Sequence, residues 1–311
     1  MSNHPSQVAI ADLAPEHLVA IEIALTNILW TDLAFETFSQ IVDGNPIRDV
    51  YHDYHGNQNR LDLEQNLVSS PEARQVVESF RKGVQLDRLV VDAQVAQAYQ
   101  KASIRSREFA LRLMEMVAVT CHDIATSFFI NADGGLHKVD PTRLPGPPRH
   151  PDLPPLMPIS PKPTELYHPE YMDYDQYPNG VADIVGYWAE YRLFGGVILF
   201  DRGESGAECN DVFIHPVQYY RVYKLSDAQI QDFVNFLSSK SSSDDKPYEQ
   251  IRFRAEKYAL RIDSHEAMSR NIYRNKYERR IPANPPRRCV YHGSDFPELA
   301  DAMADFVRHN P

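Results

Sequence analysis

The chain has 311 residues, of which 43% are hydrophobic, 24% charged and 11% aromatic, and its formal net charge is -11. This composition is that of a folded protein of one or two domains, not of a disordered or fibrous chain. The acidic balance provides no positive field for a phosphate backbone, so we expect no nucleic-acid partner.

The initial segment lacks both the basic and the apolar part of a secretory signal. The most apolar long stretch, residues 108–130, is interrupted by charged and polar side chains that are costly in a membrane. The cysteines Cys121, Cys209 and Cys289 are widely spaced, which is typical of free thiols in a reducing compartment and not of a zinc site. We therefore predict a cytoplasmic protein with no membrane span and no metal site.

Apolar residues at helical spacing predict that residues 1–140 form a mostly helical region. A first long helix is expected over residues 15–42, and Ser70 followed by a proline predicts the start of a second. A third helical region is expected over residues 86–130, with a break near 103–106.

Proline marks the next segment, because 11 of the 23 prolines fall within residues 141–169. Proline removes a backbone donor and disfavours helix in the residue before it. We therefore expect a linker or surface arm over residues 141–170. An alternative is a polyproline ligand for the aromatic groove of a protein partner.

Residues 171–311 show mixed patterns and are expected to form an α+β region, either separate from residues 1–140 or packed with them as one domain. The expected strands are residues 184–188, 197–200, 212–214 and 219–223. One helix is expected to start at Ser226, and two more are expected, one within residues 248–277 and one over residues 297–307. The predicted fold class is α+β, with a small, mostly antiparallel sheet in the C-terminal half.

The stretch GGVILFDRGESGAECNDVFIHP, residues 195–216, contains the main candidate site. Asp201 is the first charge after an apolar strand, and Glu204 lies in the loop that follows. Alternation along the next strand places Asp211 and His215 on one face, so we expect them to be neighbours. A carboxylate beside a histidine raises its basicity, which suits general acid/base catalysis.

These residues suggest a soluble enzyme acting on a small organic molecule, with His215 as base and Asp201, Glu204 and Asp211 orienting it or the substrate. Tyr187 and Trp188 would line the pocket, and the sequence indicates no particular cofactor. In the alternative interpretation the loop acids are simply hydrated and Asp201 stabilises the turn. The protein would then be a non-catalytic binding or interaction protein. Catalysis requires Asp201 and His215 to converge, whereas binding alone does not.

The adjacent His122 and Asp123 resemble the signature of the HD-domain metal phosphohydrolases, which is a second alternative. That family also uses an upstream histidine and a later aspartate, for which the candidates are His52, His55, Asp133 and Asp140. A hydrogen-bonded core histidine is the competing interpretation.

Polar side chains are dense in residues 51–66, where His52 and His55 could contact a substrate from a loop. A surface connection that satisfies its own backbone is the alternative. Arginines and tyrosines interleave in residues 271–289, which indicates either a solvated face or a site for an anionic group.

The segments NQNRLDLEQNLVSSPEAR, GGVILFDRGESGAECNDVFIHP and NIYRNKYERRIP resemble uncharacterised cytosolic proteins of filamentous fungi. The resemblance covers residues 51–130 and 184–280. It implies a fungal source and a link to specialised-metabolite pathways, but it transfers no catalytic residue, because no activity is established for those proteins.

Overall fold

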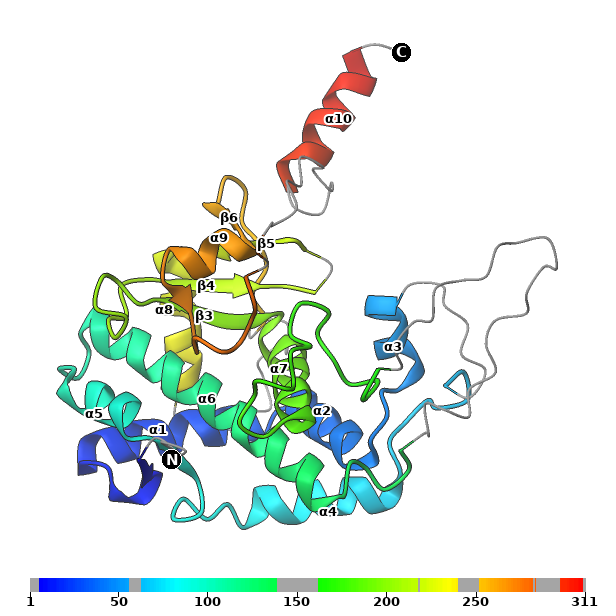
Figure 1. Ribbon diagram of the computed structural model, residues 1–311, viewed down its shortest axis with the longest axis vertical. Helices are drawn as coiled ribbons and strands as arrows, with labels where there is room; N and C mark the ends of the chain where they lie inside the picture. Colours follow the sequence, from blue (N-terminus) through cyan, green and yellow to red (C-terminus); the bar gives the residue numbers. More distant parts are fainter. Residues whose placement is uncertain are drawn as a thin grey trace.

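A long central helix, α6 (Arg107–Asn131), organises the N-terminal half of the computed structural model (Figure 1). The structure describes residues 6–55, 63–138, 162–217, 219–239, 252–281, 283 and 297–309. The other elements of this half are η1 (Ile10–Asp12), α1 (Pro15–Leu29), α2 (Asp32–Asp43), α3 (Arg48–His55), α4 (Pro71–Lys82) and α5 (Ala93–Lys101), with a small sheet of β1 (Gln7–Ala9) and β2 (Val90–Asp92).

Side-chain caps define the helix starts in this half. Ser70 and Ser106 accept from the backbone N–H groups three residues on, which confirms the predicted start after Ser70 and the predicted break before α6. The single helix expected over residues 15–42 is wrong, because Thr31 accepts from the Ala34 N–H and starts a new helix. The chain bends by 76° at this point.

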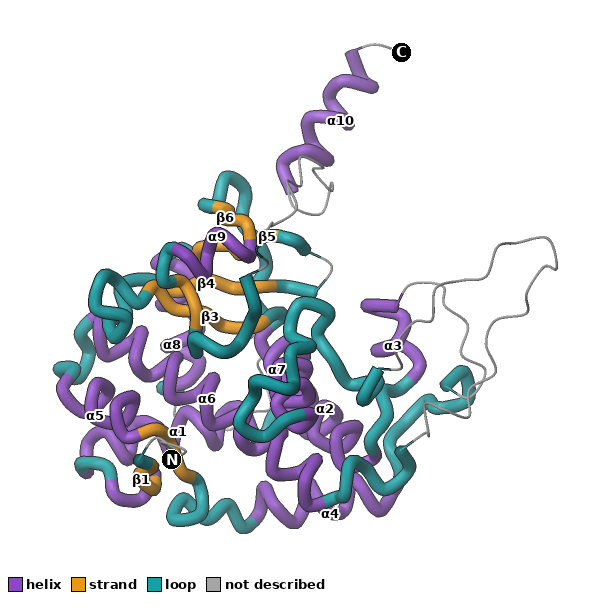
Figure 2. Tube along the Cα trace, viewed as in Figure 1, coloured by secondary structure: helices purple, strands orange, loops and turns teal. Residues whose placement is uncertain are grey.

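The C-terminal half contains the main sheet, drawn in orange above α6 in Figure 2. Its strands are β3 (Val197–Asp201), β4 (Val212–His215), β5 (Arg221–Lys224), β6 (Arg261–Asp263) and β7 (Ile272–Tyr273), in the order β6-β5-β4-β3-β7. All pairings between them in the described residues are antiparallel. Together with the helices this confirms the predicted α+β class.

The helices of this half are α7 (Val181–Phe194), α8 (Asp227–Leu237), α9 (Ser264–Ser269) and α10 (Pro297–His309). The strand expected over residues 184–188 is wrong, because this segment is the first part of α7. Glycines with positive φ stand at both ends of α7, Gly180 at 58° and Gly195 at 87°. The helix between them is buried on nearly all sides, so it has no polar face that would reveal its period. The Ser226 and Gln229 capping box is confirmed at α8.

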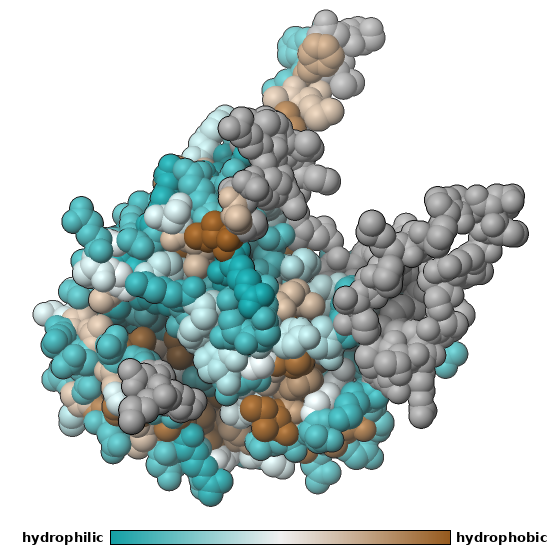
Figure 3. All heavy atoms as spheres, in the orientation of Figure 1, coloured by the Kyte–Doolittle hydropathy of each residue, from teal (hydrophilic) through white to brown (hydrophobic). Residues whose placement is uncertain are grey.

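The hydrophobic core includes residues of both halves, and α7 lies along α6 (Figure 1). Length and composition alone would allow α6 to cross a membrane, but most of its apolar window is buried inside the protein, as in a core helix. On the face shown in Figure 3, hydrophobic side chains are scattered among polar ones. Helix α10 projects from the body, and its Glu298 pairs with Arg261 of β6 at 2.6 Å.

Of the Pro-rich segment, residues 141–161 lie outside the described residues. The prediction of a linker or a partner-binding arm there stays a prediction.

Candidate functional site

His215 is buried at the end of β4, and both of its ring nitrogens are engaged. Nε2 lies 3.1 Å from the Tyr219 carbonyl and Nδ1 lies 3.1 Å from the Tyr171 hydroxyl. Because a carbonyl only accepts, Nε2 carries the proton and Nδ1 accepts from the phenol. Burial, with the nearby His168, lowers the pKa of His215 well below its usual value. No lone pair is left for a substrate proton, so the arrangement does not support His215 as a base.

His168 completes this neutral histidine site. Its Nε2 donates to the His215 carbonyl at 3.1 Å, and its Nδ1 accepts from the Glu170 N–H at 3.3 Å. Burial lowers the pKa of His168 to about 3. The pair therefore stays uncharged and fastens the segment before α7 to β4.

The expected convergence of the loop carboxylates on His215 is wrong. Val197 pairs with His215 and Asp201 pairs with Ile272, so Asp201 and His215 lie beside opposite ends of β3. Positions 197 and 201 are four residues apart along the strand, which corresponds to a separation of about 13 Å. Asp211 instead binds Arg107 at 2.8 Å and Lys224 at 2.7 Å. Alternation along a strand does not bring residues four apart into contact.

Asp201 and Glu204 have other positions. The Asp201 carboxylate accepts from the Gly203 N–H at 2.9 Å and so stabilises the turn, as the alternative interpretation predicted. Glu204 is exposed on the same loop. Gly203 has φ of 57°, and a Cβ there would lie 2.5 Å from the Glu208 carboxylate, so glycine is favoured at this turn.

The predicted substrate-binding residues are absent from the lining of two hollows, one beside the β3–β4 loop and one beside α1 and α4. Tyr187 and Trp188 are buried on α7, and Tyr187 packs edge-on against His122. His52 is on α3 and bonds to Glu64 at 3.1 Å. His55 is the last residue of α3, and its side chain lies outside the described residues.

A second histidine site, around His122, is charged. His122 Nδ1 lies 2.8 Å from Glu190, and Nε2 lies 3.2 Å from Asp183. Both carboxylates come from α7, and a Cβ on Gly186 would lie 2.4 Å from the imidazole, so glycine allows this close approach. Arg274 also pairs with Glu190.

The pKa values in this charged site follow from its partners. Burial and the charge of Arg274 act to lower the pKa of His122, but the bonds to Asp183 and Glu190 outweigh them and the pKa is raised. Burial acts to raise the pKa of Glu190, yet Arg274 and His122 lower it. The two carboxylates favour the protonated imidazole, which donates from both nitrogens, whereas the Arg274 guanidinium, 3.1 Å from Nδ1, acts against it. Asp123 is half-buried without a side-chain hydrogen bond in the described residues, and burial raises its pKa to about 6.

Ion pairs continue along α6 toward its start. Glu115 is fully buried and binds Arg202 at 2.6 Å and Arg112 at 2.8 Å. Arg202 also donates to the carbonyls of Tyr273 and Arg274, which connects this pair to the charged site. Each buried charge thus has a partner of opposite sign.

The HD-type alternative gains no support from these positions. Both nitrogens of His122 are bound to carboxylates, and Asp133 is fully exposed just after α6. Asp140 lies outside the described residues. No group of three or more potential metal ligands occurs among the residues that the structure describes.

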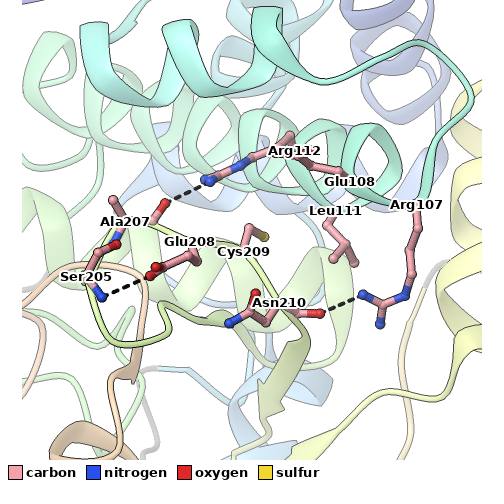
Figure 4. Close-up of a pocket in the computed structure, with 9 residues that line it drawn as sticks. All are labelled: Arg107, Glu108, Leu111, Arg112, Ser205, Ala207, Glu208, Cys209 and Asn210. Atoms are coloured by element: carbon pink, nitrogen blue, oxygen red, sulfur yellow. Dashed lines mark hydrogen bonds between the residues drawn. The ribbon is translucent and has the colours of Figure 1, made fainter.

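A hollow lies between the first turns of α6 and the loop joining β3 and β4 (Figure 4). Its volume is about 510 Å³, and its lining residues are Arg107, Glu108, Leu111, Arg112, Ser205, Ala207, Glu208, Cys209 and Asn210. The stretch singled out in the sequence therefore does reach a concavity, but with different residues. For the loop residues that line the hollow, the glycines and acids of the loop were the only signal in the sequence. Nothing in the sequence indicated that α6 would form the other wall.

Burial and the nearby Glu115 raise the pKa of the Cys209 thiol to about 12, so it is not a nucleophile at neutral pH. Comparisons of the chain with models of known protein families, with curated proteins and with solved structures found no match.

Proposed function

We propose that this protein binds a small organic molecule in the hollow between α6 and the β3–β4 loop without transforming it. The observation that carries the proposal is the hollow itself, whose volume of about 510 Å³ falls in the range of small-molecule sites. Its wall is held in place by backbone bonds such as Asn210 N–H to the Asp201 carbonyl at 3.0 Å. A fixed wall lowers the ordering cost of binding.

Binding without catalysis is favoured by the lining. No histidine is among the described residues that line the hollow, and its thiol is held in the protonated form. A carboxylate accepts a proton well only near its own pKa, and a hydrogen bond from Ser205 lowers the pKa of Glu208. The lining is thus better suited to holding a ligand than to moving its protons.

Thermal-shift screening of a metabolite library against the wild type and Ala207→Phe tests this proposal. Ala207 is exposed in the wall, so the phenyl ring fills the hollow without disturbing the core. We expect compounds that raise the Tm of the wild type but not that of Ala207→Phe. Val19→Phe, on the exposed face of α1, is the matched control. If no compound distinguishes Ala207→Phe from Val19→Phe, the proposal is wrong.

A further inference from the structure

Helix α10 carries an exposed apolar face. Leu299, Met303 and Phe306 follow one another at spacings of four and three residues, which places them along one side of the helix. Their exposed fractions are 37%, 61% and 68%. Figure 1 and Figure 3 show the helix projecting from the body, with hydrophobic side chains on its surface. An amphipathic helix normally turns such a face toward a core or a partner.

The body of the protein holds α10 at its first turn. Glu298 pairs with Arg261 of β6 at 2.6 Å, and both side chains are largely buried. In the last turn, Arg308 donates to Asp305 at 3.3 Å and His309 Nδ1 donates to the Asp305 carbonyl at 2.7 Å, so these bonds stay within the helix. A helix of 13 residues is marginal in water without packing. Burial of its apolar face against another molecule would therefore stabilise it.

The charges of α10 differ between its two ends. The carboxylate of Glu298 lies at the start, and Arg308 and His309 lie in the last turn. The pair of Arg308 with Asp305 is exposed, so exchanging it for another partner costs little. Glu298 keeps acceptor positions beside Arg261, because a carboxylate has about four of them. Both ends can therefore form ion pairs with a further molecule.

These two patterns fit a second copy of the same helix that runs in the opposite direction. When two α10 helices lie antiparallel about a two-fold axis at Met303, Leu299 of one copy lies beside Phe306 of the other. Glu298 of one copy then lies beside Arg308 of the other, and symmetry repeats this pair at the opposite end. A parallel pair would instead place Arg308 beside Arg308 and align the two helix dipoles unfavourably.

We infer that this protein forms a two-fold symmetric dimer in which α10 packs antiparallel against α10 of a second copy. The contact does not include the hollow beside α6, so the dimer is independent of the proposed function. Two helices of 13 residues bury roughly 800 Å² or less in total, which makes the dimer weak and concentration-dependent.

Sedimentation velocity of the full chain, at protein concentrations from ~1 µM to ~1 mM, tests the inference. We expect the weight-average mass to rise from that of one chain toward twice that value. Met303→Glu places two like charges beside each other at the axis, so the dissociation constant of the dimer should rise at least about tenfold. Val19→Glu, at an exposed position on α1, is the matched control and should leave the constant unchanged.

Two results of this measurement would overturn the inference. One is a chain that stays monomeric over the whole concentration range. The other is an association that Met303→Glu leaves unchanged, because the dimer would then form through another face.

The ion pairs at the two ends predict the effect of a second variant. Arg308→Glu places like charges together at both ends, so we expect a weaker dimer. The position is exposed, so the Tm of the monomer should not change. Added salt should weaken the wild-type dimer, because it screens exposed charges. A dimer as strong in Arg308→Glu as in the wild type would contradict the antiparallel arrangement.

Cysteine cross-linking determines the direction of the two helices. Leu299→Cys and Phe306→Cys are made in separate chains that also carry Cys289→Ser, since the other two cysteines are buried. After the two chains are mixed and oxidised, we expect a disulfide that joins a Leu299→Cys chain to a Phe306→Cys chain, identified by mass spectrometry. Disulfides that join only identical chains would show parallel helices and overturn the inference.

Discussion

Two buried histidine sites lie on either side of a pair of tyrosine rings and behave oppositely. The Tyr187 ring packs against His122 on one side and against Tyr171 on the other, and Tyr171 bonds to His215. The pKa of His122 is raised, whereas the pKa of His215 is lowered, although burial opposes protonation in both. Carboxylate partners in one site and a carbonyl and a phenol in the other make the difference.

Both histidines are buried but their pKa values shift in opposite directions, so burial alone does not decide the charge of a histidine. It also explains why His215, which the sequence favoured as a base, is instead a neutral structural group. Substitutions at Glu190, His122, His215 and Asp123 are expected to change stability differently at the two sites.

Glu190→Gln should have the largest effect. Glu190 is fully buried and is the shared partner of Arg274 and His122, so its loss leaves buried positive charge uncompensated. We expect a loss of about 3–5 kcal/mol in the free energy of unfolding, measured by urea denaturation at pH 7. Glu204→Gln, on an exposed loop, is the control and should change stability little. A loss no larger than that of the control would contradict the ion-pair assignment.

His122→Gln should cost about 3 kcal/mol at neutral pH, because Asp183 and Glu190 lose a shared cation. A raised folded pKa means that the contribution of His122 is fully present below the unfolded pKa and is lost as pH rises through the folded value. The cost of the variant, from denaturation at pH 6 and at pH 9, should therefore be larger at pH 6. The opposite order would show that His122 is neutral.

His215→Leu should cost about 1–3 kcal/mol at pH 7, because the Tyr171 hydroxyl and the Tyr219 carbonyl lose their partner. The pH dependence has the opposite sign to that of His122. A lowered folded pKa makes the wild type lose stability as pH falls below about 6.5, and the leucine variant does not share this loss. Its cost should thus shrink by about 2 kcal/mol at pH 5, and a constant cost between pH 7 and pH 5 would refute the lowered pKa.

Asp123→Asn should have the smallest effect, and it should be stabilising. Because the folded pKa of about 6 lies above the ordinary value of 3.8, ionisation of Asp123 lowers the stability of the fold as pH rises from about 4 to about 6, and the loss is complete above pH 6. Removing this charge should add about 1–2 kcal/mol at pH 8 and nothing at pH 4, as followed by urea denaturation. Asp133→Asn, at a fully exposed position, is the control. A loss of stability at pH 8 would instead indicate that Asp123 has an undetected partner.

Much of the helical half could be predicted because its signals are local. Ser70 in this half, like Ser226 in the C-terminal half, caps a helix with a bond that spans three residues, so the spacing in the chain contains the information, and a break near residues 103–106 was also predicted. The strands β3 and β4 were equally visible as apolar runs beside turn residues. In contrast, α7 was predicted as a strand, because a helix buried on all sides has no apolar face to count.

The residue patterns were enough to establish the α+β class, the helix starts after Ser70 and Ser226, and the loop that reaches the hollow, since each depends on residues close together in the chain. Only the tertiary structure decided that His215 is neutral, that His122 is charged and that α6 forms the second wall of the hollow. A pKa or a binding surface depends on which groups meet within a few ångströms, and here those groups are 44 to 95 residues apart in the chain.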